Sequence, residues 1–410
     1  MSDPGLRVDL LTRTFLAMER GVPDPADVHF GVLLRCAGPA PRLDELRAHV
    51  GARLGRLPAL TSRLTGEPAW EQDPDFDVAR HVHLVPGLPV EPVPVRRLVD
   101  AAPGHDRPLW RAWLLPGDGG VWGLAFAAHH ALLDGSGVLH VLRVLFGDHE
   151  PAPVVPRAPR GLAVLRVLPN VLSTLRRAPD LPVLGALTGK RRLDHASVAL
   201  ADLRAVADAT GTTVGQVHLA ALAGAVRRWS GAGERGRDVP VCVPVDTRTA
   251  EERDSLGVHL GLHRSVLPTG TADPAARLRI TARRLSRRRT ATARTATRAL
   301  VDDVPSRWSG IAMRRLGDRR NVALTASVFR PSSLTHVLGG AVQDVFALPW
   351  LPPGHGCFTI LAVHGARASL SVLTDTGVDA TRDLSALWAD EVAVLAAATG
   401  TGPARKDTTP

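Results

Sequence analysis

One segment in the first half of the chain, PLWRAWLLPGDGGVWGLAFAAHHALLDGSG at 108–137, constrains the fold most strongly. Its two apolar runs are joined by Gly-Asp-Gly-Gly, a turn signal, and the segment therefore predicts a β-hairpin. The second strand is expected to end at the paired histidines His129 and His130, with a helix after Asp134-Gly135. Antiparallel strands mixed with helices predict an α+β fold.

Apolar spacing predicts further elements on both sides of the hairpin. In the first half we expect helices at 6–20 and 42–57 and a strand at 28–38. In the second half we expect strands near 193–200, 238–248, 322–329, 357–364 and 368–374. Helices are expected there at 202–209, 214–229 and 383–397.

The length of 410 residues favours two domains. We expect an N-terminal half at 1–150 that carries the histidine pair and a C-terminal half of similar class at 190–400. Residues 151–189 begin with four prolines within 151–160 and are expected to form a linker and an amphipathic connection. Residues 401–410 are expected to be a disordered tail.

The formal net charge of +10 favours anionic partners, which include nucleic acid, a phosphorylated cofactor and an anionic membrane surface. Nine arginines fall within 277–300, but no aromatic residues for base stacking lie between them. A solvated helix face is therefore preferred there, with attraction of phosphates or anionic lipid as a second role. Nucleic acid is not expected as a partner.

The cellular location is predicted from what the sequence lacks. The three cysteines are far apart, no secretory signal opens the chain, and no run of about 18 apolar residues occurs. We therefore expect a cytoplasmic protein. Residues 161–187 are amphipathic, which favours a surface helix and leaves peripheral contact with the inner membrane surface as the alternative.

Several familiar motifs are incomplete. Gly231–Gly236 fits G-x-G-x-x-G, but it follows a predicted helix and precedes a predicted strand, the reverse of the dinucleotide-binding order. The chain has no H-E-x-x-H and no G-x-S-x-G, so neither a zincin nor a serine hydrolase elbow is supported. No metal site is predicted.

The paired histidines suggest proton transfer. Neighbouring side chains on a strand point to opposite faces, so we expect one imidazole to face the core and the other a cleft. A neutral imidazole suits removal of a proton from a hydroxyl or amine near neutral pH. Since no activated Ser or Cys is indicated nearby, direct attack of an acceptor on an activated donor such as a thioester is the simpler chemistry.

His129-His130-x-x-x-Asp134-Gly135 resembles the HHxxxDG signature of chloramphenicol acetyltransferase, condensation domains and CoA-dependent acyltransferases. Within this superfamily the chain looks most like the bacterial wax ester synthase/diacylglycerol acyltransferase family. The stretches that support the resemblance occur in the family's order, and they are LTRTFLAMER near the start, FDVARHVHLVPGLP at 76–89, DRPLWRAWLLPG at 106–117, LTGKRRL at 187–193, VPVDTR at 243–248 and ASVFRP at 326–331.

The resemblance implies two chloramphenicol-acetyltransferase-like domains with an active-site tunnel between them. His130 would be the general base, with His129 facing structure and Asp134 an architectural partner that pairs with an arginine. The remaining implied positions belong to substrate binding, with Gly135 leaving room for the pantetheine arm and an acyl-binding region at Pro108, Leu109 and Trp110.

The chain departs from the family's pattern in its second half. Gly215-Gln216 stands where the family has Asn-Asp, Leu256-Gly257-Val258 where it has Leu-Gly-Asn, and 326–331 where it has Ser-Asn-Val-Pro-Gly-Pro. The acceptor pocket is the part these departures affect. Gln216 and Ser327 are the candidate donors to the oxyanion.

We therefore predict an O-acyltransferase that joins an acyl group from acyl-CoA to a hydroxyl acceptor, with no bound cofactor. One alternative is a natural-product acyltransferase that takes its donor from a carrier protein or acylates a non-lipid alcohol or amine. Another is an inactive paralogue that binds lipid. Contact with a membrane or lipid droplet accompanies the first prediction.

Overall fold

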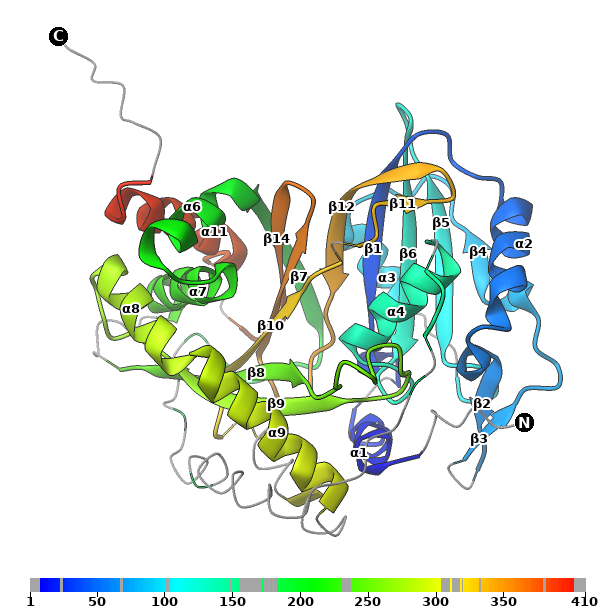
Figure 1. The fold of residues 1–410 in the computed structure, drawn as a ribbon, viewed down its shortest axis with the longest axis horizontal. Coiled ribbons are helices and arrows are strands. Elements are labelled where there is room, and N and C mark those ends of the chain that lie inside the picture. Colours follow the sequence, from blue (N-terminus) through cyan, green and yellow to red (C-terminus); the bar gives the residue numbers. More distant parts are fainter. Residues whose placement is uncertain are drawn as a thin grey trace.

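The computed structural model describes most of residues 8–401. The residues left outside the description are 23–24, 67–68, 101–103, 148, 153, most of 155–184, 231–236, 304–309, 312–317, 319, 332, 379–380 and the ends of the chain. The predicted loop at 231–236, most of the amphipathic stretch at 161–187 and residues 402–410 thus lie outside it. Two six-stranded sheets with flanking helices form the described body (Figure 1).

The first sheet is built around the predicted hairpin. Its strands, in spatial order, are β11 (His336–Val337), β12 (Gly340–Leu348), β1 (His29–Ala37), β6 (Val121–His129), β5 (Trp110–Pro116) and β4 (Val82–Leu84). All neighbours are antiparallel except β4 and β5. The other elements of this half are the helices α1 (Leu10–Glu19), α2 (Leu43–Leu54), α3 (Pro92–Val99) and α4 (Gly135–Leu145), the short hairpin β2 (Ser62–Leu64) and β3 (Trp70–Gln72), and single 3-10 turns at Pro25–Val28, Pro58–Thr61 and Val78–Arg80.

The β5–β6 hairpin forms where the turn signal predicts it. Gly119 and Gly120 both have positive φ, 64° and 73°, a conformation that glycine adopts without steric cost. The N–H of Val121 donates to the carbonyl of Asp118 across the turn at 3.2 Å. Both strands are almost wholly buried. Their side chains are therefore apolar on both faces of the sheet.

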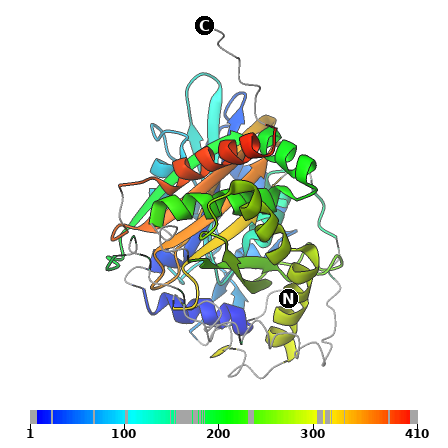
Figure 2. The ribbon, with the colours of Figure 1, turned by 90° about the vertical axis from the view of Figure 1, so that its left-hand side faces the viewer.

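The second sheet comes from the second half of the chain. Its order is β7 (Arg191–Ala199), β14 (Arg367–Asp375), β13 (Cys357–His364), β10 (Leu324–Phe329), β8 (Val239–Asp246) and β9 (Leu260–Leu267). Three helices cover its outer face, as Figure 2 shows, and they are α6 (Leu200–Thr210), α7 (Val214–Ser230) and α11 (Leu384–Ala398).

The two halves are interlocked by strand β12. It belongs to the second half by sequence, yet it pairs with β1, with Gly31 opposite Leu348 and Ala37 opposite Ala341. The expected half at 190–400 therefore contributes two strands, β11 and β12, to the sheet of the first half. The boundaries predicted near residues 150 and 190 stay a prediction.

The arginine-rich run at 277–300 is divided between two helices, α8 (Pro274–Arg284) and α9 (Arg287–Asp303). Helix α9 packs on β9 and β8 through a face that includes Ala293, Ala296 and Leu300. Its arginines are mostly exposed, in keeping with the preferred solvated face. Among the described helices, none combines the length and apolar character needed to cross a bilayer.

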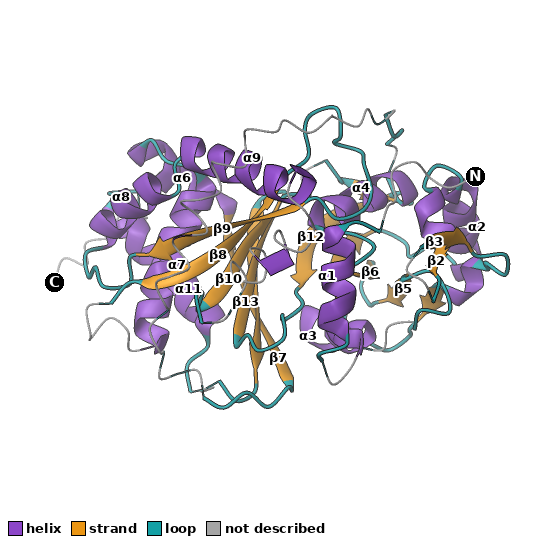
Figure 3. Cartoon of the chain, turned by 90° about the horizontal axis from the view of Figure 1, so that it is seen from below, coloured by secondary structure: helices purple, strands orange, loops and turns teal. Residues whose placement is uncertain are grey.

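Each sheet has its own hydrophobic core. Trp110, Trp122 and Phe126 are fully buried in the first core, and Trp388 on α11 is fully buried in the second. Figure 3 shows α1 at the junction between the two sheets. The predicted mixed α+β architecture is confirmed.

Candidate active site

The end of strand β6 fixes the backbone of both histidines. The N–H of His129 donates to the carbonyl of Leu109 at 2.9 Å, and the N–H of His130 donates to the carbonyl of Val28 at 3.1 Å. Both imidazoles are buried, with exposed fractions of 0% and 7%, but they have different neighbours. The two side chains therefore leave the strand end in different directions, as the strand geometry predicts.

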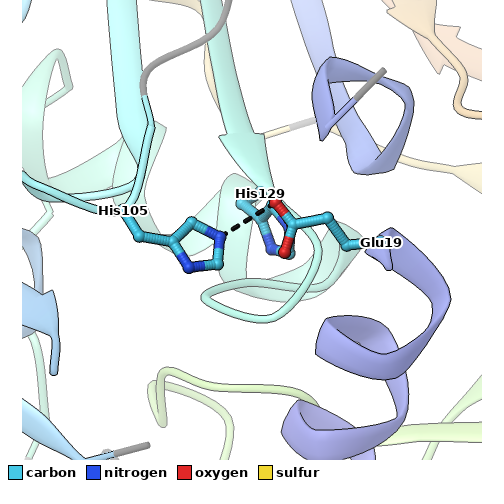
Figure 4. A group of neighbouring side chains, drawn as sticks. All are labelled: Glu19, His105 and His129. Carbon is cyan, nitrogen blue, oxygen red and sulfur yellow. Dashed lines mark hydrogen bonds and ion pairs between the residues drawn. The ribbon is translucent and has the colours of Figure 1, made fainter. Parts of the chain in front are cut away.

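His129 lies in a polar cluster with residues from two other segments. Figure 4 shows the carboxylate of Glu19, at the end of α1, directed toward the imidazoles of His105 and His129. The Nε2 atom of His105 lies 2.9 Å from Oε1 of Glu19, and the Nε2 atom of His129 lies 3.7 Å from the same oxygen. Hydrogen bonding to Glu19 raises the pKa of His105, whereas burial holds the pKa of His129 well below its usual value.

These three groups are close enough to share a metal ion, but the hydrogen bonding of His129 opposes it. The N–H of Ala131 donates to Nδ1 of His129 at 2.9 Å. The neutral ring must then carry its own proton on Nε2, the atom that faces Glu19. A metal-binding nitrogen has to be unprotonated, so the cluster is better suited to hydrogen bonding than to metal.

A second cluster of metal-ligating side chains lies beside α4. The carboxylate of Asp254 is 3.0 Å from Nε2 of His149 and 3.3 Å from Nδ1 of His140. The guanidinium of Arg143, however, approaches Nδ1 of His149 at 2.9 Å. A fixed positive charge at this distance opposes binding of a divalent cation.

His130 is surrounded by aromatic rings. Phe15 of α1 is stacked on the imidazole with a centroid distance of 4.1 Å and an interplanar angle of 2°. Phe30 of β1 covers the ring at 4.4 Å, and Trp350 meets it edge-on at 5.1 Å. These aromatic contacts fix the orientation of the imidazole. Because Phe15 and Phe30 stack on the ring, a reactant has to approach a ring nitrogen in the plane of the ring.

Burial lowers the pKa of His130 to about 4, although the nearby negative charge of Asp134 acts in the opposite direction. The ring is therefore neutral at physiological pH and can accept a proton. Cys242 lines the same space, but burial raises the pKa of its thiol to about 12. A thiol in that state is a poor nucleophile, so the imidazole is the reactive group that these surroundings favour.

A buried ion pair holds the turn after the histidines. Asp134 caps α4, since its carboxylate accepts from the N–H of Gly137 at 2.8 Å. Nη1 of Arg248, from the second half, donates to both carboxylate oxygens at 2.9 and 2.8 Å. The N–H of His259 donates to Oδ2 at 2.7 Å. Burial raises the pKa of Asp134, but Arg248 and these N–H donors lower it below its usual value overall, so the pair stays charged.

Two adjoining cavities lie between the sheets, and His130 lines the larger of them. The larger, about 570 Å³, is called the α1 cavity here, and its lining includes Leu11, Phe15, Met18, His130, Trp350 and Phe358. The smaller, about 490 Å³, is called the α9 cavity, and its lining includes Asp134, Asp246, Thr290, Arg294, Phe329 and Arg330. Both volumes are in the range of small-molecule sites.

The two cavities meet beside the histidine motif. They share six lining residues, which are Phe30, Gly135, Pro244, Leu260, Ser327 and Ile360. A molecule that spans both cavities therefore passes Gly135 and the edge of His130. This is the region where the resemblance implies a tunnel.

The structure brings some of the predicted substrate-binding residues to this point and not others. Gly135 and Ser327 line both cavities. Gln216 lies away from them, with its side-chain amide donating to the carbonyls of Ala282 and Leu285. The predicted acyl-binding region also lies outside the lining of the two cavities, since Trp110 is fully buried and donates its indole N–H to the carbonyl of Leu60 at 2.7 Å.

Several site residues were not singled out from the sequence. Arg248 ends the stretch VPVDTR, which supports the family resemblance, but the sequence alone does not identify Arg248 as the partner of Asp134. Phe15 and Glu19 are four residues apart on α1, and this spacing places them on one side of that helix. That spacing was the available signal for a helix that contacts both histidines.

Comparison with known proteins points to one family. Residues 29–171 match the model of the wax ester synthase/diacylglycerol acyltransferase catalytic domain. A putative diacylglycerol O-acyltransferase of Mycobacterium tuberculosis is 32% identical over 293 residues, which cover 59% of this chain and 62% of that protein. A probable diacylglycerol O-acyltransferase of the same species, tgs1, is 26% identical over 374 residues, 77% of this chain and 80% of that protein. The match thus spans less than two thirds of the first of these relatives.

Solved structures share the fold over nearly the whole chain. The wax ester synthase/diacylglycerol acyltransferase from Marinobacter aquaeolei VT8 has a TM-score of 0.65 at 18% identity, covering 95% of this chain and 98% of that one. The first condensation domain of the calcium-dependent antibiotic synthetase has a TM-score of 0.72 at 20% identity, covering 96% of each chain. The resemblance indicated by the sequence is confirmed.

Proposed function

We propose that this chain is an acyltransferase that moves an acyl group from a CoA thioester to a hydroxyl acceptor, with His130 as the general base. One observation carries the proposal, namely that the buried neutral imidazole of His130 lines the α1 cavity and packs on Phe30, a residue that lines both cavities. Two reactants that enter from different cavities would meet beside one proton acceptor. The family match supports the same reaction class.

The reaction needs no covalent enzyme intermediate. The acceptor hydroxyl attacks the thioester carbonyl while the imidazole of His130 takes its proton. The tetrahedral intermediate then collapses, the C–S bond breaks, and the imidazolium returns the proton to the leaving thiolate. The products are an ester and the free thiol of CoA. A pKa below the working pH keeps all of the imidazole in its base form, although it also makes the base weaker.

The developing oxyanion requires a donor at the same point. Ser327 is the remaining candidate, since it lines both cavities, whereas the amide of Gln216 is occupied elsewhere. Asp134 is proposed to hold the turn after His130 in place and not to contact substrate, because its carboxylate already accepts from Arg248 and from two backbone N–H groups.

The character of the α1 cavity supports an apolar acceptor. Leu11, Met18 and Phe358 line it together with the aromatic residues around His130. A fatty alcohol or a diacylglycerol matches such a lining. Delivery of such acceptors from an anionic membrane or lipid-droplet surface to a cytoplasmic enzyme is part of the proposal, and the net charge of +10 supports it.

The test combines purified protein, long-chain acyl-CoA and a panel of alcohols, diacylglycerol and amines. Thiol release and mass spectrometry of the products identify the acceptor. His130→Ala is expected to lower the rate about 10²- to 10⁴-fold, the usual contribution of a general base. His336→Ala, which removes an exposed histidine on β11, is the matched control and should leave the rate unchanged.

The outcomes separate the proposal from its alternatives. Turnover that survives His130→Ala contradicts the mechanism. Turnover with an acylated carrier protein but with no acyl-CoA favours the natural-product alternative. Lipid binding without turnover, unaffected by His130→Ala, identifies a binding protein.

A further inference from the structure

The open end of the α9 cavity carries two arginines from different parts of the chain. Arg294 lies on α9 and Arg330 directly after β10, and both line the cavity and are exposed. We propose that Arg294 and Arg330 bind the phosphates of the donor's phosphopantetheine arm, as found in CoA, so that the donor enters through the α9 cavity. This inference rests on the proposed function, because it assigns a route to the donor of that reaction.

The charges in the cavity are arranged along its depth. Asp134 is buried at the inner end, with an exposed fraction of 3%, next to the shared residue Gly135. Asp246 accepts from Oγ of Ser136 at 2.7 Å and from Nη1 of Arg248 at 3.2 Å. Both carboxylates that line the cavity thus already contact Arg248. The two exposed arginines therefore dominate the charge at its open end.

Neither arginine forms an ion pair with another described residue. Within the described part of the chain, Arg294 and Arg330 have no carboxylate at salt-bridge distance. Nη2 of Arg330 lies near the start of α7, where a Cβ atom on Gly215 would be 3.5 Å from it. The guanidinium of Arg330 therefore lies within van der Waals reach of the start of α7.

The chemistry of the two cavities distinguishes their ligands. A guanidinium offers a planar fork of N–H donors that matches a phosphate. The lining of the α1 cavity is instead mostly apolar and includes one charge of each sign, the half-buried Asp318 and the exposed Arg320. A polyanionic arm is favoured in the α9 cavity and an apolar acceptor in the α1 cavity.

Equilibrium binding of unacylated CoA to the full chain, measured by calorimetry, tests the assignment without turnover. Arg294→Ala and Arg330→Ala are each expected to weaken CoA binding about 5- to 10-fold, and the double variant more. Arg288→Ala removes an exposed arginine of α9 that does not line the cavity, and it should change the affinity less than 2-fold. Pantetheine, which has no phosphate, should bind all five proteins, the wild type and the four variants, alike.

The source of the phosphate is resolved by adding 4′-phosphopantetheine. Binding as tight as that of CoA, with the same dependence on the two arginines, supports the arginine site and identifies the arm of a carrier protein as a sufficient ligand. Weaker binding than CoA supports the site and shows that the nucleotide phosphates contribute.

Other outcomes overturn the inference. These are no CoA binding by the wild-type protein, unchanged binding in both arginine variants, or equal weakening by Arg288→Ala, which would indicate a general field of positive charge. The inference and the proposed function fail separately. CoA binding that depends on Arg294 and Arg330 without any ester formation contradicts only the proposed function, whereas ester formation that depends on His130 but not on these arginines contradicts only the inference.

Discussion

His129 and His130 are adjacent in the chain and both are buried, but their surroundings differ in kind. His129 faces a carboxylate and two other histidines, with the ring of His29 at 4.9 Å and that of His105 at 5.8 Å. His130 faces Phe15, Phe30 and Trp350 and the wall of a cavity. In our proposal, the polar surroundings of His129 fix the end of strand β6, and the aromatic surroundings of His130 orient the imidazole that acts as the base.

Helix α1 connects these two regions. Glu19 at its end contacts His129 and His105, and Phe15, one turn earlier, stacks on His130. Helix α1, which places Phe15 on His130, is thus also held in position by the contacts of Glu19 with His105 and His129. Changes on the polar side should therefore affect stability first, and changes on the aromatic side should affect turnover first.

The largest expected effect on stability comes from Arg248→Met, which removes the guanidinium paired with the buried carboxylate of Asp134. Loss of one member of a buried ion pair costs about 3–5 kcal/mol, because Asp134 is left charged and buried. Denaturant unfolding measures this loss, and kcat should fall as well. Arg277→Met breaks another buried pair, with Glu391, and should reduce stability without changing the kcat of folded enzyme. Equal effects of both variants on kcat would contradict a specific role for Arg248.

His129→Ala should lower the free energy of unfolding by about 1–3 kcal/mol, because it leaves the buried N–H of Ala131 without its acceptor and removes a buried ring beside Glu19. Turnover per folded molecule should fall far less than in His130→Ala. His218→Ala, another fully buried histidine but in the second half, is the control for loss of a buried ring. A loss of turnover in His129→Ala as large as in His130→Ala would erase the distinction between the two residues.

Phe15→Leu removes the stacked ring from His130 and should cost about 0.5–1.5 kcal/mol in stability. Because the imidazole loses its orientation, kcat should fall more than KM rises. Phe76→Leu removes a comparable stack on His81, with a centroid distance of 5.1 Å, and serves as the control. A rise in KM with unchanged kcat would show that Phe15 only lines the acceptor cavity.

Glu19→Gln should have the smallest effect, about 1 kcal/mol or less, because His105 is partly exposed and solvent screens the pair. Glu19 raises the pKa of His105, so the stabilising charge pair is present at low pH and is lost as pH rises through that pKa. The difference in Tm between the wild-type protein and Glu19→Gln should be largest below pH 6.5 and smaller at pH 9. A difference that does not change with pH would show that charge on His105 is not involved.

Local patterns predicted the hairpin, the strand end and the turn at Asp134, because these depend on residues close together in the chain. The partners of the motif could not be obtained in this way. Arg248 is 114 residues from Asp134, and β12 crosses from the second half to pair with β1. The positions of Gln216 and Trp110 relative to the cavities were likewise set by tertiary packing, which family motifs alone do not show.

The dependence of kcat/KM on pH tests most directly whether buried, neutral His130 is the base. Burial lowers the pKa of His130 to about 4, and kcat/KM reports the pKa of the free enzyme's essential base. Brief assays started from enzyme held at pH 7.5, with folding checked at each pH, should show activity that stays level through pH 6.5 and falls only near pH 4. A fall centred near pH 6.5, the value of an exposed imidazole, would contradict this role for His130.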